Sequence, residues 1–559
     1  MSKHIESSHF IEQIIQADLD AGFPAEKLRF RFPPEPNGYL HIGHVKAIAL
    51  NFNLGKKFNA PVNLRFDDTN PAKESDEFVN AIKNDLQWLG YEWAEERYAS
   101  DYFDKLFAWA KELISKGLAY VDLQNSEEIA VQKGTPTRAG INSPFRDTTP
   151  RQNLALFNEM AAGKHGEGSM ALRAKINMNS PNMLLRDPVI YRILNKEHHR
   201  TGSTWCIYPM YDWTHGESDY IEGISHSLCT LEFKPHRDLY EWFLSNLTPL
   251  GHSYPKQREF ARLNLSYTVT SKRKLAVLIE NKFVSGWDDP RMPTISGLRR
   301  RGYTPEALRN FVETAGVSKR ENVIDVSLLE FCVREDLNLK ASRVMAVLDP
   351  IKLVITNYPE GVTEMLEAEN NPEDESKGSR LIPFSKNLFI ERDDFKEEVN
   401  RKYFRLTLGK EVRLKSAYII EGQSLVKDAE GNIIEIYCTY DSDSKSGSGS
   451  EASQRKVKGT IHWVSQETSI SAQVNVYDRL FNDESPDQHK DQDFTDFINR
   501  DSLSQLMAKV EPSLVNLIPG TNVQFQRLGY FVLDINSTHG NLIFNKTVGL
   551  RDTWSKKGN

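Results

Sequence analysis

The sequence is poor in cysteine and has no long hydrophobic run. Its 559 residues include four cysteines, Cys206, Cys229, Cys332 and Cys438, and no C-x-x-C pair. This spacing argues against a disulfide framework and against a cysteine-rich zinc site. No apolar run approaches the ~18 residues of a membrane helix, and the N-terminal MSKHIESSHFIEQIIQ lacks the apolar centre of a secretory signal. We therefore expect a cytoplasmic protein with no membrane association.

Neither sign of charge is in large excess. The chain has 77 acidic and 70 basic residues, which gives a net charge of −7 and a pI near 6.1. This balance argues against indiscriminate nucleic-acid binding, but it leaves room for a local basic face that binds RNA. With 39% hydrophobic residues, the composition excludes a disordered or collagen-like chain, and the length predicts about three to five domains.

Strand-like and helix-like segments alternate between residues 28 and 100. LRFRF and PVNLRF indicate short strands, whereas HVKAIALNFNLGKKF and ESDEFVNAIKNDLQWLGY have the apolar spacing of helices. Strand, helix and strand in this order predict a right-handed parallel βαβ unit. The glycine fingerprint of dinucleotide-binding folds, G-x-G-x-x-G, is absent from this region.

The remaining chain changes character twice. Residues 101–210 are mixed and polar, which indicates an insertion or a second domain, and helical patterns return at 211–340. From residue 343 onward, short β-rich runs separated by turn residues predict β-barrels. The polar stretches 364–379 and 441–454 predict mobile loops between strands.

The first chemical motif is RFPPEPNGYLHIGHVKA, residues 31–47. Gly38 and Gly43 would let a ligand approach the backbone, and His41 and His44 lie close to the start of a helix. Unpaired N–H groups and the helix dipole favour an anion there. Imidazoles at this place could donate to phosphate oxygens whose charge grows during transfer. Taken alone, the pair is better explained as two surface histidines at a tight strand-to-helix turn.

The second motif is TVTSKRKL, residues 268–275. Ser271 and three basic residues, Lys272, Arg273 and Lys274, stand between apolar segments. A loop that brings an ammonium group to a pyrophosphate would have this composition. A short basic run is more often a solvated surface, so the motif is weak alone. The two motifs together are far more specific than either.

Together, PNGYLHIGH and VTSKRK resemble the HIGH and KMSKS motifs of the class I aminoacyl-tRNA synthetases. LRFDDTNP, MYDWTHGESDYIEG, SHSLCTLEF, GWDDPRMPTISGLRRRGYT and TVGLRDTW are similar to the bacterial type of glutaminyl-tRNA synthetases. The likeness runs from about residue 25 to the C-terminus. It implies an α/β multidomain protein, divided as follows: a Rossmann-type catalytic domain at 25–100 and 211–262, an acceptor-stem-binding insertion at 101–210, a helical connecting domain with the KMSKS-like loop at 263–342, and two anticodon-binding β-barrels at 343–559.

The resemblance also implies the reaction. Such an enzyme ligates L-glutamine to the 3′ end of tRNA(Gln) through a glutaminyl-adenylate, with ATP as substrate, Mg²⁺ on the pyrophosphate and no bound metal ligands of its own. A monomer is expected. His41, His44 and Lys272 would be catalytic. The ATP-binding positions implied by the motifs are Glu35, Pro36, Asn37, His41, Gly43, His44, Lys46, Thr230, Arg262, Leu263, Thr270, Ser271 and Lys272.

Five further positions match the amino-acid pocket of this family. Arg31 would pair with the substrate carboxylate and Asp67 with its ammonium, while Tyr211 and His215 would meet the side-chain amide. Cys229 stands where glutamyl enzymes have an arginine, and a neutral thiol cannot balance a buried second carboxylate. Glutamine is therefore favoured. A glutamyl-tRNA synthetase is the nearest alternative, followed by a non-catalytic tRNA-binding relative.

RNA contacts are implied less firmly than the catalytic residues. The family places anticodon contacts at Lys319, Arg320, Arg343, Lys402, Arg405, Gln524 and Arg527. Their donors and planar groups suit unstacked bases. Two positions depart from the family pattern, because Lys402 replaces a glutamine and Pro136 replaces a leucine of the acceptor loop. Base readout at these two places is left open.

Overall fold

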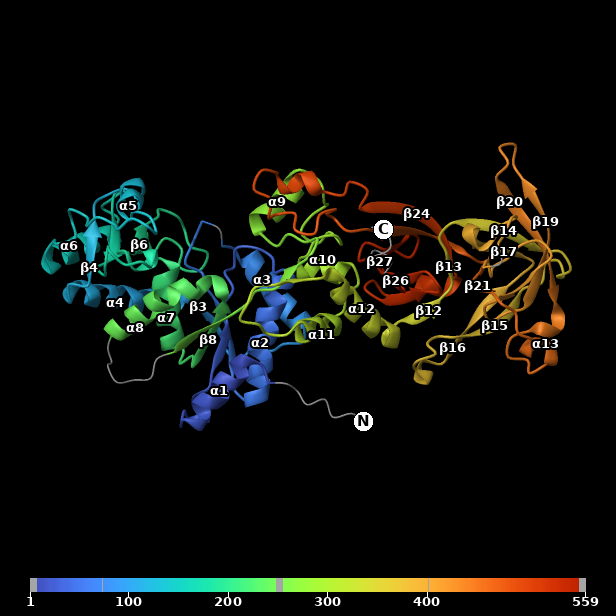
Figure 1. Ribbon diagram of the computed structural model, residues 1–559, viewed down its shortest axis with the longest axis horizontal. Helices are drawn as coiled ribbons and strands as arrows, with labels where there is room; N and C mark the ends of the chain where they lie inside the picture. Colours follow the sequence, from blue (N-terminus) through green and yellow to red (C-terminus); the bar gives the residue numbers. More distant parts are fainter. Residues whose placement is uncertain (1–7, 73, 248–254, 401, 552–559) are drawn as a thin grey trace. The chain divides into compact units, whose positions relative to one another are not determined.

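The computed structural model describes residues 8–72, 74–247, 255–400 and 402–551, and it divides into two compact units (Figure 1). Unit 1 comprises Met1–Asn264 and Val312–Ile324, and unit 2 comprises Leu265–Phe311 and Asp325–Asn559. The first seven residues of MSKHIESSHFIEQIIQ and the end of TVGLRDTW lie outside the described residues. Across the described ranges, no helix combines the length and apolar composition that crossing a membrane requires.

A parallel sheet lies at the centre of unit 1 (Figure 1). Its first strands are β1 (Phe30–Phe32), β2 (Val62–Phe66) and β3 (Glu96–Tyr98), connected by α2 (Ile42–Phe58) and α3 (Asp76–Trp88). All pair in parallel, with Phe30 opposite Val62 and Leu64 opposite Glu96, which confirms the predicted βαβ order. The other helices around this sheet are α1 (Phe10–Asp20), α7 (Tyr211–Ile221) and α8 (Arg237–Asn246).

The second half of the sheet is contributed by residues beyond 210. Strand β8 (His226–Thr230) pairs in parallel with β9 (Lys256–Phe260). Ser225 N donates to Arg29 O at 3.0 Å, which places β8 beside β1. The resulting strand order is β3-β2-β1-β8-β9. The chain adds β2 and β3 on one side of β1 and then β8 and β9 on the other side, so the order of connection reverses between β1 and β8. Open α/β sheets bind ligands at such a reversal, beyond the carboxyl ends of the strands. The predicted Rossmann-type architecture is confirmed.

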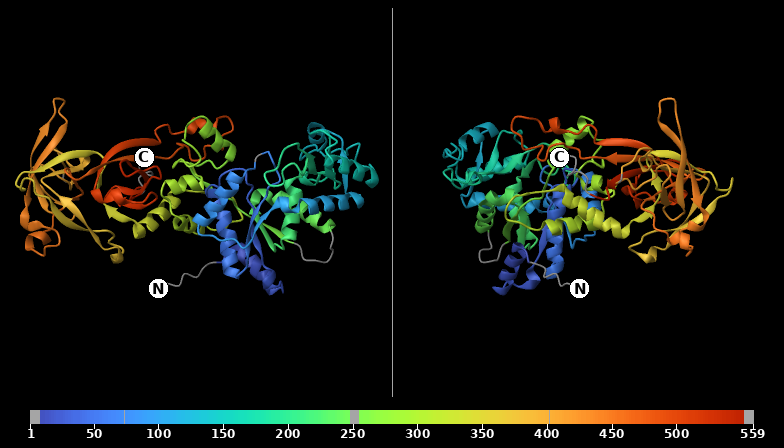
Figure 2. Two further views of the ribbon diagram at one scale, coloured as in Figure 1. Left: turned by 180° about the vertical axis from the view of Figure 1, so that it is seen from behind. Right: turned by 45° about the vertical axis from the view of Figure 1, so that its right-hand side comes forward.

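The chain between β3 and α7 forms a separate antiparallel layer (Figure 2). Its strands, in sheet order, are β4 (Ala119–Asp122), β5 (Ala171–Ala174), β6 (Val189–Ile193) and β7 (Ile207–Pro209), and its helices are α4 (Phe103–Ser115), α5 (Ser126–Gln132) and α6 (Pro150–Ala161). Leu106, Phe157 and Leu172 are buried in one core with Trp213 of α7. The insertion is therefore packed directly on a helix of the catalytic region.

Unit 2 begins with helices. They are α9 (Lys272–Glu280), α10 (Ile295–Arg300) and α12 (Val326–Lys340), while α11 (Pro305–Ala315), β10 (Asn264–Leu265) and β11 (Val323–Ile324) lie where the chain passes between the units. The start of α10 is capped by Thr294, whose side chain accepts from Gly297 N, and that of α12 by Asp325, which accepts from Ser327 N. Such caps satisfy N–H groups that have no partner inside the helix.

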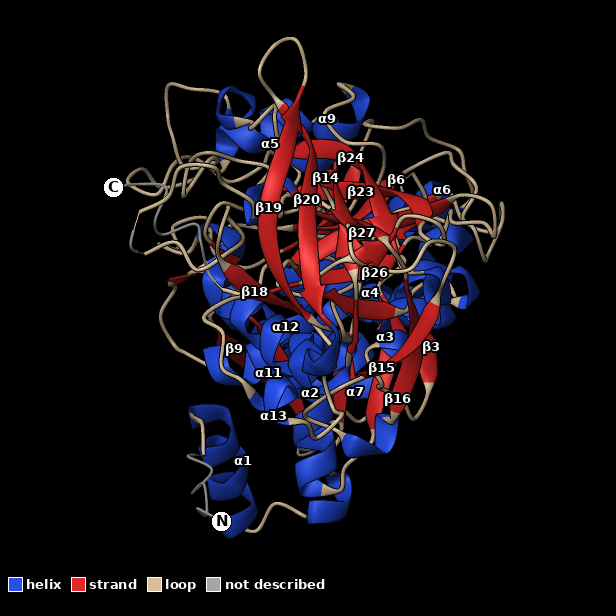
Figure 3. Cartoon of the chain, turned by 90° about the vertical axis from the view of Figure 1, so that its right-hand side faces the viewer, coloured by secondary structure: helices blue, strands red, loops and turns tan. Residues whose placement is uncertain are grey.

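Two curled seven-stranded sheets complete unit 2 (Figure 3). We call them barrel 1, with strand order β21-β18-β19-β20-β14-β17-β22, and barrel 2, with order β12-β25-β26-β27-β23-β24-β13. The strands of barrel 1 are β14 (Pro350–Ile355), β17 (Asn387–Glu391), β18 (Glu411–Leu414), β19 (Ile419–Lys427), β20 (Ile433–Asp441), β21 (Thr460–Ile461) and β22 (Val464–Ser465). Those of barrel 2 are β12 (Ser342–Val344), β13 (Ala346–Val347), β23 (Ile470–Tyr477), β24 (Leu503–Val510), β25 (Asn522–Phe525), β26 (Gly529–Leu533) and β27 (Leu542–Val548). The chain thus forms the first two strands of barrel 2, then all the strands of barrel 1, and then the other strands of barrel 2. The predicted β-barrels are confirmed.

The predicted loop at 364–379 is wrong for Glu364–Glu369 and for Ser379, which are strand residues, whereas residues 370–378 do connect two strands. Strand β15 (Glu364–Glu369) begins this stretch and pairs antiparallel with β16 (Ser379–Phe384), with Leu366 opposite Ile382. Leu366 and Ala368 face the core, whereas Met365, Glu367 and Glu369 face outward. This alternation of two is typical of a strand, and the acidic composition concealed it. The second stretch, 441–454, ends in the short helix α13 (Glu451–Gln454).

Candidate active site

The two predicted histidines lie at the N-terminus of α2. The Nδ1 atom of His41 accepts from Gly43 N at 3.1 Å, and His41 N donates to Nδ1 of His44, also at 3.1 Å. Because Nδ1 is an acceptor in both rings, each neutral ring carries its hydrogen on Nε2. The ring centroids are 4.0 Å apart. The turn thus places two imidazole donors at a helix N-terminus, where phosphate is favoured.

Gly43 is required by the position of the His41 ring. A Cβ at this residue would lie 2.8 Å from Cε1 of His41, which is closer than real Cβ contacts, and 3.7 Å from the carbonyl oxygen of Leu263. Any side chain would therefore push the histidine ring away. The same contact shows that Gly43 and Leu263, both predicted ATP residues, meet at this turn.

The remaining ATP candidates of unit 1 lie in the loops that follow β1 and β9, at the end of β8 and in α2. Glu35, Pro36 and Asn37 follow β1, Lys46 lies in the second turn of α2, Thr230 ends β8, and Arg262 follows β9. These loops leave the carboxyl ends of parallel strands, which is the edge at which such sheets bind ligands. Lys46 is buried, and burial lowers its pKa. Arg262 is exposed and lies 4.0 Å from Glu321.

Arg31 is enclosed by protein groups. Its Nε donates to Asp219 at 2.9 Å and its Nη2 to Ser227 Oγ at 2.7 Å, while Nη1 donates to Leu228 O at 2.8 Å. Nη2 also lies 2.6 Å from Nε2 of His215. Pairing of Arg31 with a substrate carboxylate stays a prediction. In this structure its guanidinium orients Asp219 and His215 inside the site.

Asp67 has one carboxylate oxygen to spare. Oδ1 accepts from Arg65 Nε at 3.0 Å, whereas Oδ2 is buried without a hydrogen-bond partner among the described residues. Burial raises the pKa of Asp67 to about 7. An ammonium group beside Oδ2 would satisfy this oxygen and favour the ionised carboxylate. The geometry therefore fits the predicted contact with the substrate amine.

Tyr211, His215 and Cys229 form an uncharged region of the site. Burial lowers the pKa of His215 to about 3, so its ring is neutral. Since Nε2 accepts from Arg31, Nδ1 carries the hydrogen and faces Tyr211 Oη at 3.4 Å. Burial also raises the pKa of Tyr211 and of Cys229, with Asp67 among the charges near the tyrosine. A phenol, an imidazole and a thiol, all neutral, suit an amide better than a carboxylate.

Three neighbours of Cys229 were not predicted. Glu259 lies opposite Cys229 in the pairing of β8 and β9, and it accepts from Arg237 Nε at 3.0 Å and from Gln257 Nε2 at 2.9 Å. The positive charge of Arg237 is thus balanced by Glu259. The alternation in KQREF places Gln257 and Glu259 on one face of a strand, and this period of two could have identified them.

Asp68, His198 and His199 have the composition of a metal site, with candidate ligand atoms within 4.8 Å of one another. However, Nδ1 of His198 accepts from the backbone N of Arg200 at 3.2 Å, so Nε2 carries the hydrogen and donates to Asp68 O at 2.7 Å. A ring bonded in this way does not offer Nε2 to a metal. The cluster instead ties the turn that carries Asp67 to the insertion.

The TSK loop belongs to unit 2. Thr270 is partly buried, Ser271 precedes α9, and Lys272 is the first residue of that helix. The predicted catalytic lysine therefore stands at a helix N-terminus, another place that favours an anion.

The base of this loop is held by the connection between β23 and β24. Val269 and Leu275 share a buried core with Phe481 and Phe494. Tyr267 N donates to the backbone oxygen of residue 484 at 2.8 Å. Lys274 Nζ lies 3.8 Å from Asp487 Oδ2. Residues from barrel 2 therefore fix the segment that carries Lys272.

Comparisons with known proteins agree with this geometry. The family model "tRNA synthetases class I (E and Q), catalytic domain" matches residues 27–339, and two models of the family's anti-codon binding domain match 341–441 and 460–534. A glutamine–tRNA ligase of Rhodopirellula baltica is 57% identical over 98% of this chain and 91% of its own. One from Salmonella heidelberg is 54% identical, covering 99% and 98%. The chain belongs to the class I tRNA synthetases of the E and Q group.

The recognition of a glutaminyl type of class I synthetase is thereby confirmed, and ATP is a substrate of this family. Among solved structures, a glutamate tRNA ligase from Elizabethkingia meningosepticum is 19% identical, with a TM-score of 0.43 over 56% of this chain and 70% of that one.

The candidate RNA contacts of this synthetase fall into three groups. Lys319 and Arg320 are exposed in unit 1, where Lys319 Nζ lies 4.7 Å from the centroid of the Phe10 ring. In unit 2, Lys402 is exposed. Arg405 and Arg527 converge on one buried carboxylate, that of Asp394.

Arg343 and Gln524 form the third group and lie opposite each other where β12 pairs with β25. Arg343 is only 4% exposed. Its Nη1 donates to the backbone oxygens of Asn338 and Ala341 at 2.7 and 2.8 Å, and its Nη2 to Asn338 Oδ1 at 2.8 Å. The guanidinium thus caps the C-terminus of α12. A direct anticodon contact by Arg343 stays a prediction. The role of Arg343 in capping α12 was not predicted from the sequence.

Proposed function

We propose that this synthetase ligates L-glutamine to the 3′ end of tRNA(Gln) through a glutaminyl-adenylate. The observation that carries the choice of amino acid is the uncharged region around Cys229. Its thiol stays protonated, His215 is neutral, and Arg237 is balanced by Glu259. A substrate carboxylate there would lack a counter-charge, whereas an amide would not. The names and full-length coverage of the relatives support the same amino acid.

The alternative of a glutamyl-tRNA synthetase is disfavoured by these relatives and by the pocket. It would need a cation that is not already paired beside Cys229. The two described arginines whose charges act on Cys229, Arg31 and Arg237, are paired with Asp219 and Glu259. A non-catalytic relative would have no use for the paired histidines on α2 or for a lysine that opens α9, so we do not favour it.

Activation requires one substrate carboxylate oxygen to bond to the α-phosphorus of ATP while pyrophosphate leaves. We assign the protein's part to positioning and charge stabilisation. Asp67 would hold the amine, Tyr211 the amide, and His41 and His44 would donate from Nε2 to phosphate oxygens. Lys272 would neutralise the leaving pyrophosphate. Transfer then joins the activated carbonyl to the terminal ribose hydroxyl and releases AMP.

Magnesium fits this arrangement as a companion of ATP. The turn around α2 offers imidazole and backbone N–H donors, and cationic or N–H donors suit phosphate oxygens rather than a metal. Mg²⁺ is bound mainly through substrate phosphates in such sites and neutralises their charge. We further propose that the enzyme acts as a monomer in the cytoplasm.

We also propose a role for each region of the chain. The insertion at 101–210 would bind the acceptor stem, since it packs on α7, which carries Tyr211 and His215. The helical region at 263–342 would connect the catalytic domain at 25–100 and 211–262 to the anticodon-binding barrels at 343–559. The anchoring of the TSK loop by barrel 2 offers a route by which anticodon binding could bias Lys272.

Charging of total tRNA with each labelled amino acid tests the proposal. We expect glutamine alone to be esterified, to tRNA(Gln), in an ATP-dependent reaction. Esterification of glutamate instead would establish the competing enzyme, and no esterification at all would favour the non-catalytic relative. Pyrophosphate exchange with and without tRNA would show whether activation depends on RNA.

A further inference from the structure

Asp394 lies at the junction of the two barrels and bridges two arginines. It follows β17 of barrel 1 and is 1% exposed. Arg527, from the turn between β25 and β26 of barrel 2, binds it with both terminal nitrogens, at 2.5 and 2.7 Å. Arg405 of barrel 1 approaches the same carboxylate, with Nη1 3.3 Å from Oδ1. A single buried negative charge thus holds two positive charges.

The arginines keep one side toward solvent. The side chain of Arg527 is 30% exposed and that of Arg405 is 45% exposed. Arg405 is also fixed by a bond from Nη1 to the backbone oxygen of Asp393 at 3.1 Å, and Arg527 Nη1 lies 3.2 Å from Nδ1 of buried His462. Since the arginine donates, Nδ1 of His462 accepts this bond. The cluster of Asp394 with Arg405 and Arg527 therefore keeps one surplus positive charge that borders solvent, and the Glu391 carboxylate lies 3.5 Å from Nε2 of His462.

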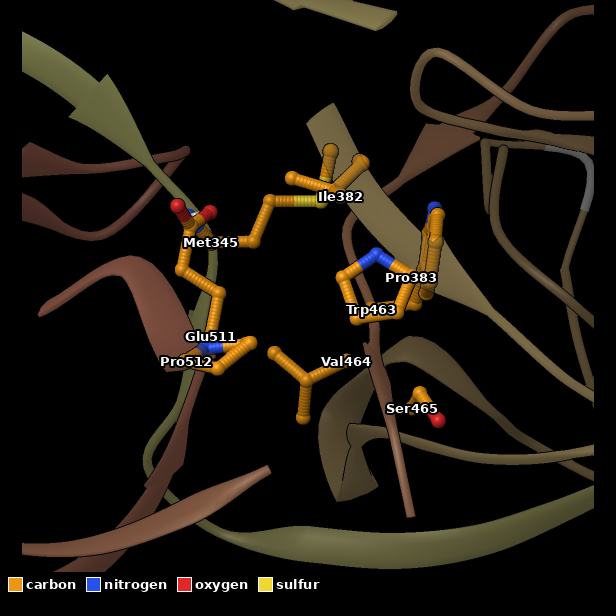
Figure 4. Close-up of a pocket in the computed structure, with 8 residues that line it drawn as sticks. All are labelled: Met345, Ile382, Pro383, Trp463, Val464, Ser465, Glu511 and Pro512. Atoms are coloured by element: carbon orange, nitrogen blue, oxygen red, sulfur yellow. Dashed lines mark hydrogen bonds between the residues drawn. The ribbon is translucent and has the colours of Figure 1, made fainter. Parts of the chain in front are cut away.

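A second carboxylate at the same junction, that of Glu511, lines a small cavity (Figure 4) and is arranged differently. Glu511 of barrel 2 is 3% exposed and pairs with one arginine, Arg380, which is 14% exposed. The two Arg380 bonds are 2.6 and 2.8 Å, and Met345 N donates to the same carboxylate at 2.8 Å. Beside it, Ile382, Pro383, Trp463 and Val464 help to enclose a cavity of about 10 Å³, the space of one water.

The Glu511–Arg380 pair and the Asp394 cluster are suited to different roles at the junction. The Glu511 pair is balanced in charge and enclosed, which is what a purely structural contact between barrels needs. The Asp394 cluster has an excess of donors and faces solvent, which is what recognition of an anion or of base acceptors needs. Residues 341–441 and 460–534 both match anti-codon binding domains, and Arg405 and Arg527 come from one match each.

We propose that Asp394 is a positioning residue for RNA, holding one arginine from each anticodon-binding domain in the orientation that binds the anticodon loop. The proposal rests on the function proposed above. Arginine binds with less loss of conformational freedom when its planar group is already oriented. Removing the carboxylate charge should release both side chains, so the cost appears in tRNA recognition and not in the chemistry at His44 or Lys272.

The test compares three variants of the full-length chain: Asp394→Asn, the adjacent exposed Asp393→Asn, and Glu511→Gln. Each is assayed for glutamine charging with cognate tRNA and with tRNAs altered at single anticodon positions. For Asp394→Asn we expect KM for cognate tRNA to rise roughly 10-fold, with kcat changed less. We also expect discrimination against at least one altered anticodon to fall by roughly 5- to 150-fold, the range for one lost specific contact. Asp393→Asn should match the parent chain, and Glu511→Gln should lower Tm without changing the discrimination ratio.

The possible results distinguish a failure of the positioning role of Asp394 from a failure of the proposed function. An unchanged discrimination ratio in folded Asp394→Asn, or an equal loss in Glu511→Gln, would overturn the positioning role while leaving glutamine charging intact. Absence of charging by the parent chain would overturn the function itself. If Asp394→Asn does not fold, Arg405→Lys, Arg527→Lys and the double variant replace it. If the losses of anticodon discrimination in the two single variants multiply in the double variant, the arginines act independently and the shared role of Asp394 is contradicted. If the double variant loses no more discrimination than either single variant, the shared role is supported.

Discussion

Asp67 and Arg65 form a salt bridge that engages only one oxygen of the carboxylate. Arg65 Nε bonds to Oδ1 at 3.0 Å, and the buried Oδ2 is unpaired among the described residues. We expect Asp67→Asn to weaken the binding free energy of glutamine by about 1.5–3 kcal/mol, the contribution of a hydrogen bond to a charged group, and to raise KM for glutamine accordingly. Steady-state pyrophosphate exchange measures this, with thermal unfolding to confirm the fold. A KM within a factor of two of the parent would remove Asp67 from the pocket.

The pKa of Asp67 predicts a pH dependence of glutamine binding. Burial raises this pKa to about 7, so part of the ligand-free protein has a protonated carboxyl at neutral pH. The ammonium of glutamine needs the ionised form. The affinity for glutamine should therefore increase from pH 6 to pH 8, and this increase should vanish in Asp67→Asn. Calorimetric titration with the non-reactive pair of glutamine and AMP can measure it, and a flat profile in the parent chain would contradict the assignment.

Lys272 opens α9, and its ammonium is expected to act on the leaving pyrophosphate. Lys272→Ala should lower kcat for glutamine activation by about 10²–10³-fold, the worth of one preorganised donor to a transition state. Arg273 is exposed in the same turn of the helix, so Arg273→Ala is the matched control and should have little effect. If both variants lose activity equally, general charge is responsible. Near-normal turnover of Lys272→Ala would exclude it from the mechanism.

Cys229 is expected to set the choice between glutamine and glutamate. Cys229→Arg should lower kcat/KM for glutamine and raise it for glutamate, because it adds a counter-charge and crowds the amide. Glu259 lies opposite Cys229 and would neutralise part of the new charge, so the variant Cys229→Arg with Glu259→Gln should shift the ratio further. Cys229→Ser keeps the site neutral and serves as control. An unmoved ratio in all three would place Cys229 outside the pocket.

Arg343 caps the end of α12, and this contact predicts a loss of stability on mutation. Arg343→Ala would remove its bonds to the backbone oxygens of Asn338 and Ala341 and to Asn338 Oδ1, at about 1.5–3 kcal/mol for a hydrogen bond to a charged group, although Ala341 O keeps Asn371 and Asn338 Oδ1 keeps Tyr530 as donors. Chemical denaturation should therefore show a lower free energy of unfolding. The same variant tests the anticodon prediction, because a loss of tRNA charging at temperatures where the fold is intact would show a role in RNA binding as well.

Glu217 is buried on α7, with neither carboxylate oxygen hydrogen-bonded to another described residue. Burial raises its pKa well above the ordinary value, so the folded protein binds a proton that the unfolded chain releases. Stability from this group is complete below the unfolded pKa of about 4.3 and falls as pH rises toward the folded pKa, by up to about 1.4 kcal/mol per pH unit. Glu217→Gln should flatten this decline in Tm between pH 5 and 8. The exposed Glu241→Gln is the control, and an unchanged slope in Glu217→Gln would mean that Glu217 is ionised.

Local chemistry made several elements predictable from the sequence. The apolar spacing around HIGH leads to α2, and LRFRF and PVNLRF lead to β1 and β2, because burial of a strand or of one helix face requires these periods. The close approach of His41 to Gly43 is likewise a property of a few neighbouring residues. Period-two alternation could also have shown β15, although its glutamates concealed it.

Only the tertiary structure decided which distant side chains compensate one another. Arg31 is 188 residues from Asp219, Arg237 and Glu259 lie on different elements, and Asp394 meets Arg527 across two barrels. The sequence determined the family, the order of elements and the two nucleotide motifs, because each depends on residues close in the chain. It could not determine that Arg343 would cap a helix, or that Asp67 would keep one unpaired oxygen. Charge compensation and burial depend on through-space distance, which folding establishes between residues that no local pattern connects.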